Sequence, residues 1–214
     1  MAVRGTLMLL CSLAVLSSTA DQDETLLQNC TSQTQLLKRL SAVLKGEAEC
    51  GGSQPSEWSP QQTAALLLSM RNVTEALHRH QLKECHGAEP KRCPEAEVPR
   101  GGGLACVTVA NKRYCKPLCG HGYDFAFIRR SRLYDECSEQ TGYRWQTQYV
   151  GGNKLAVCNE ASIQVSGAKT AYFPEGRDCL ASKLQSDAVV DVFTSELRDG
   201  GVQGEPHSAC LVCG

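Results

Sequence analysis

The sequence predicts an α+β fold: an N-terminal helical hairpin, then a small disulfide-rich β module and a short C-terminal helical extension. In the first half, apolar residues recur at spacings of three and four, which is typical of amphipathic helices. In the second half, short strand-like runs alternate with turn residues among closely spaced cysteines, which is typical of strands tied by disulfides. We expect a signal peptide (1–20), the hairpin (21–88), a linker (89–103), the β module (104–165) and the extension (166–214).

The N-terminus has the three parts of a secretory signal peptide. Arg4 gives it a basic start, residues 6–16 are mostly apolar, and Ser18 and Ala20 are small residues where signal peptidase requires them. The apolar run is shorter than the roughly 20 residues that span a bilayer, and no later segment approaches that length. We therefore expect cleavage after Ala20, a secreted extracellular protein and no membrane span.

The helical hairpin is predicted from two apolar stripes. Residues 24–44 carry one stripe, and the helix should end at Gly46. In the second helix Ser59 can cap the free amides, Pro60 fits the first turn, and Gln62 can reach back to the cap. The stripe of this helix then follows as Leu66, Met70, Val73 and Leu77, and the helix should end near Gly87.

A polar loop joins the two helices, so they should pack antiparallel, with the start of the first beside the end of the second. In this arrangement Cys30 and Cys85 could meet. The hairpin either folds on its own small core or offers a coiled-coil face through which an oligomer could form.

The β module should contain two hairpins. Residues 104–109 and 113–118 flank the turn residues Asn111 and Lys112, and residues 143–150 and 154–158 flank a Gly-Gly-Asn turn. In the extension, Ser186 and Asp187 can start a helix that ends at a Gly-Gly pair. The apolar side of that helix is formed by Val189, Val190, Phe193 and Leu197.

The cysteines point to an oxidising compartment. The chain has thirteen, and removal of Cys11 with the signal peptide leaves twelve, an even number that favours complete pairing. The count alone gives no connectivity. The twelve are Cys30, Cys50, Cys85, Cys93, Cys106, Cys115, Cys119, Cys137, Cys158, Cys179, Cys210 and Cys213.

Sequons at Asn29 and Asn72 predict glycosylation. At Asn29 the middle residue of the sequon is Cys30, which can enter a disulfide before the glycan is added. The net charge of −1 gives no reason to expect binding to nucleic acid or to an acidic membrane surface.

No catalytic, cofactor or metal site is predicted, and we do not expect an enzyme. The chain has neither a G-x-S-x-G nor an H-E-x-x-H motif. Cys115, Cys119 and His121 have a spacing that zinc could use, but in a secreted chain disulfides compete for the same sulfurs. Cys210 and Cys213 have the spacing of a redox dithiol, but without the strand and helix of such a centre a structural bridge is favoured.

Arginine and aromatic residues concentrate between residues 112 and 145. Protein interfaces use both as anchors, because such side chains bury a large area and still form hydrogen bonds. We expect Arg129, Arg130, Arg132 and Tyr134 to contact a partner. In the alternative interpretation, the aromatics form the core of the module and the arginines its solvated edge.

Three short segments and a later cysteine resemble the core of sushi (complement control) modules: Cys119-Gly-His-Gly-Tyr123, Tyr134-Asp-Glu-Cys137, Gly142-Tyr-Arg-Trp145 and Cys158. The resemblance implies a disulfide between Cys119 and Cys158, and another that joins Cys137 to Cys93 or Cys106. It also implies binding to proteins or glycans. The segment from Cys115 to Cys213 is also similar to the C-terminal part of cephalotoxin-like secreted proteins.

These observations predict a secreted, disulfide-rich protein that binds an extracellular protein or glycan. Two other functions share the same composition. One is a secreted toxin or host-defence protein, and the other is a secreted thiol-redox enzyme, which would need a reduced cysteine.

Overall fold

The computed structural model describes residues 41–42, 45, 59–147, 150–185 and 188–214. The chain divides into two compact units, residues 1–66 and 67–214. The predicted signal peptide, Asn29, Cys30, Cys50 and nearly all of the first predicted helix lie outside the described residues. The pairing of two helices into a hairpin therefore stays a prediction.

Helix α3 (Pro60–Leu82) begins as the sequence predicts, because Ser59 and Gln62 form a reciprocal cap. The amide of Gln62 donates to Ser59 Oγ at 3.2 Å, and the amide of Ser59 donates to Gln62 Oε1 at 2.9 Å. A short 3-10 helix, η2 (Lys83–Cys85), continues the chain. The predicted apolar stripe of α3 is exposed, and none of its described residues is buried. In the described part of the chain, no helix has the length and apolar character that a membrane span needs.

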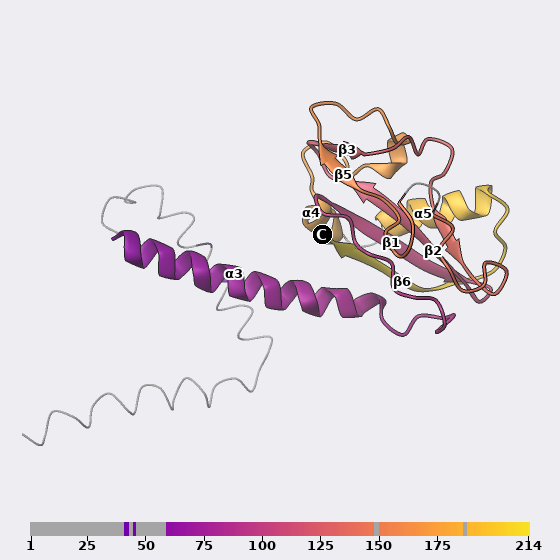
Figure 1. Ribbon diagram of the computed structural model, residues 1–214, viewed down its shortest axis with the longest axis horizontal. Coiled ribbons are helices and arrows are strands. Elements are labelled where there is room, and N and C mark those ends of the chain that lie inside the picture. Colours follow the sequence, from indigo (N-terminus) through magenta and orange to yellow (C-terminus); the bar gives the residue numbers. More distant parts are fainter. Residues whose placement is uncertain (1–40, 43–44, 46–58, 148–149, 186–187) are drawn as a thin grey trace, which may run out of the picture. The chain divides into compact units, whose positions relative to one another are not determined.

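An antiparallel sheet of four strands is the centre of the second unit, in the order β4-β2-β1-β6 (Figure 1). Strands β1 (Gly102–Val109) and β2 (Lys112–Cys119) form the first predicted hairpin. Its turn lies one position earlier than predicted, because Lys112 pairs with Val109, and the turn residues Ala110 and Asn111 have positive φ angles of 48° and 58°. These angles suit the tight turn that connects twisted strands. The outer strands are β4 (Asp135–Cys137) and β6 (Pro206–Cys213).

The second predicted hairpin is wrong. Among its described residues, 143–147 and 150–157 contain no strand, and only Lys154 forms an isolated bridge, to Glu97. Trp145 is instead buried, with its indole donating to the carbonyl of Pro94 at 2.9 Å. The chain becomes a strand only at β5 (Cys158–Glu160), which pairs with β3 (Tyr123–Phe125) in a second small sheet.

The two faces of the main sheet carry different cores because side chains alternate along each strand. On one face, Val107 and Leu211 pack against α5 (Ala188–Asp199), whose Phe193 and Leu197 are buried as the sequence predicts. The other face carries Leu104, Cys106 and Cys210. Figure 1 shows α5 against the sheet.

The C-terminal residues complete this sheet. Strand β6 lies beside the central strand β1, with Cys106 opposite Cys210 and Leu104 opposite Val212. The short helix α4 (Cys179–Lys183), capped by Asp178, is tied to β6 through the Cys179–Cys213 disulfide. The predicted extension therefore contributes both a strand and a covalent link to the same core as the predicted β module.

Within the described residues, five disulfides join all ten cysteines: Cys85–Cys210, Cys93–Cys137, Cys106–Cys115, Cys119–Cys158 and Cys179–Cys213. The prediction of a disulfide-rich chain is confirmed, and this content is compatible with a secreted extracellular protein. The expected meeting of Cys30 with Cys85 is corrected, because Cys85 is bonded to Cys210.

Two of these disulfides are pairs that the sushi resemblance implies. Cys119 is bonded to Cys158, and Cys137 is bonded to Cys93. The alternative partner of Cys137 was Cys106, which instead crosses from β1 to Cys115 on β2.

Candidate functional site

The four residues expected to contact a partner lie in different environments. Arg129 is buried, Arg132 and Tyr134 are partly buried, and Arg130 is exposed. The ring of Tyr134 packs between Tyr114 and Phe193, with both ring centroids 5.8 Å away. The aromatic part of the expected surface thus belongs to the core over α5, while Arg130 stays open to solvent.

Arg129 and Arg132 share one buried carboxylate. Asp135 has no exposed side-chain surface, and its Oδ2 lies 2.9 Å from Arg129 Nη2 while its Oδ1 lies 2.6 Å from Arg132 Nη2. The contact with Oδ1 is an ion pair by distance, without the alignment of a hydrogen bond. Arg129 also donates to the carbonyl of Leu155 at 2.8 Å. These contacts fix the segment that leads to β4.

Two loops lie side by side next to these arginines: residues 126–132 and residues 161–167. The amide of Arg129 donates to the carbonyl of Ser166 at 2.7 Å. Arg130 Nε donates to the carbonyl of Val165 at 2.9 Å. The exposed guanidinium of Arg130 is therefore anchored at its base rather than extended freely into water.

Asp124 on β3 holds the second loop in place. Its carboxylate accepts hydrogen bonds from the amides of Val165 and Ser166, both at 3.1 Å, and from the hydroxyl of Tyr172. Burial alone would raise the pKa of Asp124, but these bonds and one from the amide of Phe125 outweigh burial and lower that pKa below its ordinary value of 3.8. Burial and the same carboxylate raise the pKa of Tyr172 to about 12.

The two loops that the hydrogen bonds of Arg129 and Arg130 join expose large apolar side chains. We call Phe127, Ile128, Arg130, Ile163 and Val165 the loop patch. Ile128 is 73% exposed and Ile163 is 65% exposed, although both are aliphatic. Exposed apolar side chains that gather on hydrogen-bonded loops are typical of interaction surfaces.

Replacement of Asp124 by Asn should destabilise the protein in a pH-dependent way. Because the folded pKa is lowered, the carboxylate stabilises the fold fully above pH 3.8 and loses this effect as the pH falls through the folded pKa. At pH 7, Asp124→Asn should cost about 1–3 kcal/mol, since the charged acceptor of several hydrogen bonds is lost. The difference in unfolding free energy between the two proteins should shrink towards pH 2.

Glu139→Gln is the matched control for this comparison, because Glu139 is exposed. Denaturant unfolding of the three proteins at pH 7, 4 and 2 is the measurement. Equal stabilities of wild type and Asp124→Asn at pH 7 would contradict the role of Asp124.

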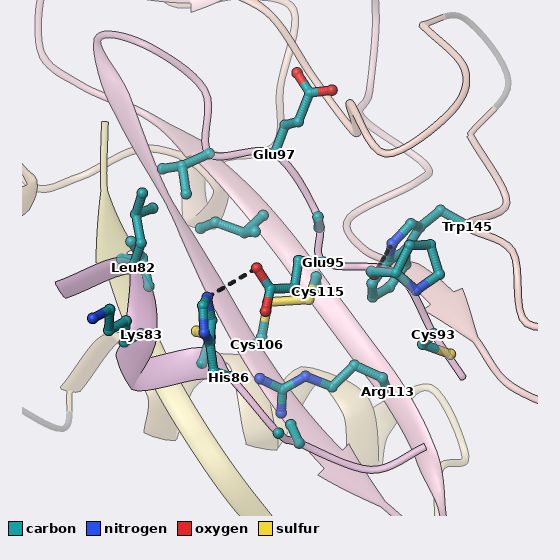
Figure 2. Close-up of a pocket in the computed structure, with 18 of the residues that line it drawn as sticks. Leu82, Lys83, His86, Cys93, Glu95, Glu97, Cys106, Arg113, Cys115 and Trp145 are labelled. Carbon is teal, nitrogen blue, oxygen red and sulfur yellow. Dashed lines mark hydrogen bonds and ion pairs between the residues drawn. A yellow bond between two sulfur atoms is a disulfide. The ribbon is translucent and has the colours of Figure 1, made fainter. Parts of the chain in front are cut away.

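A groove of about 910 Å³ opens in the second unit, over the sheet face that carries Cys106. Its floor includes Leu104, Cys106 and Cys115, and Trp145 also lines it (Figure 2). Residues 86–98 form a wall, in which His86 Nε2 lies 2.9 Å from Glu95 Oε2. The groove thus combines an apolar floor, cysteines of three disulfides (Cys85–Cys210, Cys93–Cys137 and Cys106–Cys115) and a charged rim.

Arg113 is the buried cation of this groove. It is 5% exposed, and its guanidinium donates to Thr108 Oγ1 at 3.1 Å, to the carbonyl of Ser208 at 2.6 Å and to Cys210 Sγ at 3.1 Å. Burial lowers the pKa of Arg113 to about 10, so the side chain is still charged at neutral pH. None of its hydrogen bonds within the described chain goes to a carboxylate.

Other residues singled out in the sequence have clear positions. Asn72 is exposed on α3, so an attached glycan would meet no packed neighbour there.

The sulfurs of Cys115 and Cys119 are in different disulfides, which leaves no thiolate beside His121 for zinc. Cys210 and Cys213 are not bonded to each other: each reaches a distant cysteine, as the structural interpretation predicts.

The sequence did not predict the groove or the aliphatic residues of the loop patch, Ile128, Ile163 and Val165. The groove combines residues from 78 to 212, so no local pattern could indicate it. Ile128 and Ile163 offered one weak signal, since both lie outside any predicted strand or helix. Comparisons with protein families, with curated proteins and with solved structures found no match for this chain.

Proposed function

We propose that this protein is secreted and binds an extracellular protein partner through the loop patch. The observation that carries the proposal is the exposure of Ile128 and Ile163 on two loops that hydrogen bonds from Arg129 and Arg130 hold together. An aliphatic side chain open to water gains free energy when a partner covers it, about 25 cal/mol for each Å² buried. Because the loops are already ordered, little conformational entropy is lost on binding.

The chemistry of the patch favours a protein over a glycan. Aliphatic side chains match the apolar groups of a protein surface, whereas glycans present hydroxyl groups that need polar contacts. Arg130 supplies one exposed cation at the patch, which can pair with a carboxylate of the partner. We therefore expect a partner surface with apolar side chains around an acidic group.

Site-specific photo-crosslinking of the full secreted protein tests this function. A photoreactive amino acid replaces Ile128, Ile163 or, as a control, Leu184, which is 88% exposed and lies outside the patch. With extracellular fluid or intact cells, positions 128 and 163 should capture the same protein and position 184 should not. Excess wild type should compete, while Ile128→Glu should compete about 30-fold less well, the effect of a central interface residue.

Two results would overturn the proposal. One is capture of the same proteins from all three positions. The other is competition by Ile128→Glu that equals that of wild type, while Leu184→Glu behaves identically. Competition by free glycans in place of protein would assign the patch to glycan recognition instead.

A further inference from the structure

Three cysteines lie in a row across the middle of the sheet. Cys106 on the central strand β1 is directly opposite Cys115 on β2 and directly opposite Cys210 on β6. All three belong to the core on the same face of the sheet. Opposite residues of antiparallel strands have Cα atoms about 4.5–5.5 Å apart, which is within the range of a disulfide. Cys106 therefore has two neighbours with which it can pair.

The sulfurs of the two disulfides in this row are close together. The Sγ atoms of Cys85, Cys106 and Cys210 all lie within 4.8 Å of one another, although Cys106 is bonded to Cys115 and Cys85 to Cys210. Exchange between a thiolate and a disulfide needs direct approach of sulfur to sulfur. The fold thus holds the reacting atoms of such an exchange near contact.

The groove gives access to this row. Cys85, Cys106 and Cys115 line the groove, and Cys85 is partly exposed, whereas Cys106 and Cys210 are buried. Figure 2 shows the Cys106–Cys115 disulfide in the groove, together with His86, Glu95 and Arg113. An external thiol that enters from solvent therefore meets Cys85 before it can meet Cys210.

Arg113 makes Cys210 the better leaving group. Its guanidinium donates to Cys210 Sγ at 3.1 Å, and within the described chain this buried cation has no carboxylate among its hydrogen-bond partners. If Cys210 became a thiolate, its negative charge would pair with the guanidinium of Arg113. Departure of the thiolate from a disulfide is faster when the thiol that forms has a lower pKa.

We propose that the Cys85–Cys210 disulfide is a site of attack by an external thiol, and that Cys210 then re-pairs with Cys106. In the first step, the external thiolate bonds to Cys85 Sγ, the Cys85–Cys210 bond breaks, and its electron pair goes to Cys210 Sγ. In the second step, this thiolate bonds to Cys106 Sγ, the Cys106–Cys115 bond breaks, and Cys115 leaves as a thiolate that takes a proton from water. Each step exchanges one disulfide for another, so no further oxidant or reductant is needed.

The exchange changes what the disulfides connect. Cys85 in η2 loses its covalent bond to β6, while β1 and β6 gain one. The remaining links between the end of α3 and the sheet include the hydrogen bond from Gln81 Nε2 to the carbonyl of Cys213 at 2.9 Å. The product therefore keeps a bridged sheet but holds α3 by non-covalent contacts.

Reaction of the folded, full secreted protein with reduced glutathione tests the proposal. After a short exposure at pH 7 and quenching with an alkylating agent, non-reducing peptide mapping should find glutathione on Cys85, a Cys106–Cys210 disulfide and an alkylated Cys115. The Cys119–Cys158 and Cys179–Cys213 disulfides serve as internal controls and should stay intact. Glutathione on one of these controls first, or no Cys106–Cys210 disulfide beside modified Cys85, would overturn the proposal.

Two sets of variants separate the steps. Arg113→Gln should slow modification of Cys85 about tenfold relative to Arg113→Lys, which keeps the charge. In the double variant Cys106→Ser and Cys115→Ser, glutathione should still bond to Cys85, and Cys210 should be alkylated because its second partner is missing. Equal rates for folded Arg113→Gln and Arg113→Lys would refute the role of the cation, and unreactive Cys85 in the double variant would refute the order of the steps.

Discussion

Replacement of Asp135 by Asn should lower the free energy of unfolding by about 3–5 kcal/mol. The carboxylate of Asp135 is completely buried and is paired with Arg129 at 2.9 Å and with Arg132 at 2.6 Å. An amide leaves the buried guanidinium of Arg129 without an anion, and an uncompensated charge in the interior is among the most costly defects in a protein. Because small folded domains are stable by only about 5–15 kcal/mol, this loss should be visible in any denaturant titration.

The neighbouring residue provides the control. Glu136 lies on the same strand, but its ion pair with Lys112 at 3.4 Å is partly open to solvent. Glu136→Gln should cost less than about 1 kcal/mol. If Asp135→Asn were as stable as Glu136→Gln, the buried ion cluster would not stabilise the fold as the geometry indicates.

Asp135 also shows why the expected binding residues could not be ranked from the sequence. Arg129, Arg130 and Arg132 look alike there, since each lies within four residues of the next and none belongs to a periodic pattern. Arg129 is buried because it meets Asp135, at the start of β4, and the carbonyl of Leu155, whereas Arg130 is exposed. Burial of a charge depends on a partner that tertiary structure supplies, and local composition cannot report it.

Elements with a strong local signal were predicted well. The helix α5 follows from the spacing of Phe193 and Leu197, and the β1–β2 hairpin from the turn at Asn111. Helix α3 starts at the cap formed by Ser59. In each case the residues that determine the element lie within about ten positions of one another, so the sequence alone shows the helical spacing, the turn or the cap.

The pairing of strands far apart in the chain could not be predicted from the sequence. Strand β6 joins β1 across about a hundred residues, and both of its faces are buried near Cys210, so it lacks the alternation that marks a half-exposed strand. The strand expected at 143–150 is absent from its described residues, 143–147 and 150. Its aromatic residues suggest a strand, but Trp145 is buried and its indole donates to the carbonyl of Pro94. The row of three cysteines exists because β6 pairs with β1, a contact that the sequence does not indicate.

The second large effect concerns Lys116, a lysine in the core over α5. Its side chain is 1% exposed, and Nζ lies 2.5 Å from Glu196 Oε2 on that helix. Burial lowers the pKa of Lys116 below its ordinary value of 10.5, and the carboxylate of Glu196 partly opposes this change. Loss of the carboxylate leaves the buried ammonium unpaired, so Glu196→Gln should cost about 3–5 kcal/mol at pH 7.

The pH dependence distinguishes this mechanism from a simple packing defect. Because the folded pKa of Lys116 is lower than the unfolded value of 10.5, the unfolded chain binds more protons between the two values, and stability should rise with pH across that window. In Glu196→Gln the folded pKa of Lys116 should fall further. The increase in unfolding free energy with pH should therefore begin at a lower pH and be larger than in wild type. A packing defect would cost the same at every pH.

Two further variants complete the test of Lys116. The double change Lys116→Met and Glu196→Gln should recover most of the stability lost in Glu196→Gln, since an apolar side chain of similar length replaces the unpaired cation. Glu97→Gln is the exposed control, because Glu97 and its partner Lys154 are 3.8 Å apart and both about half exposed. It should change stability by less than about 1 kcal/mol. If Glu196→Gln were equally mild, or if its cost did not fall as the pH rises towards 10.5, the buried lysine would not depend on Glu196 for its charge.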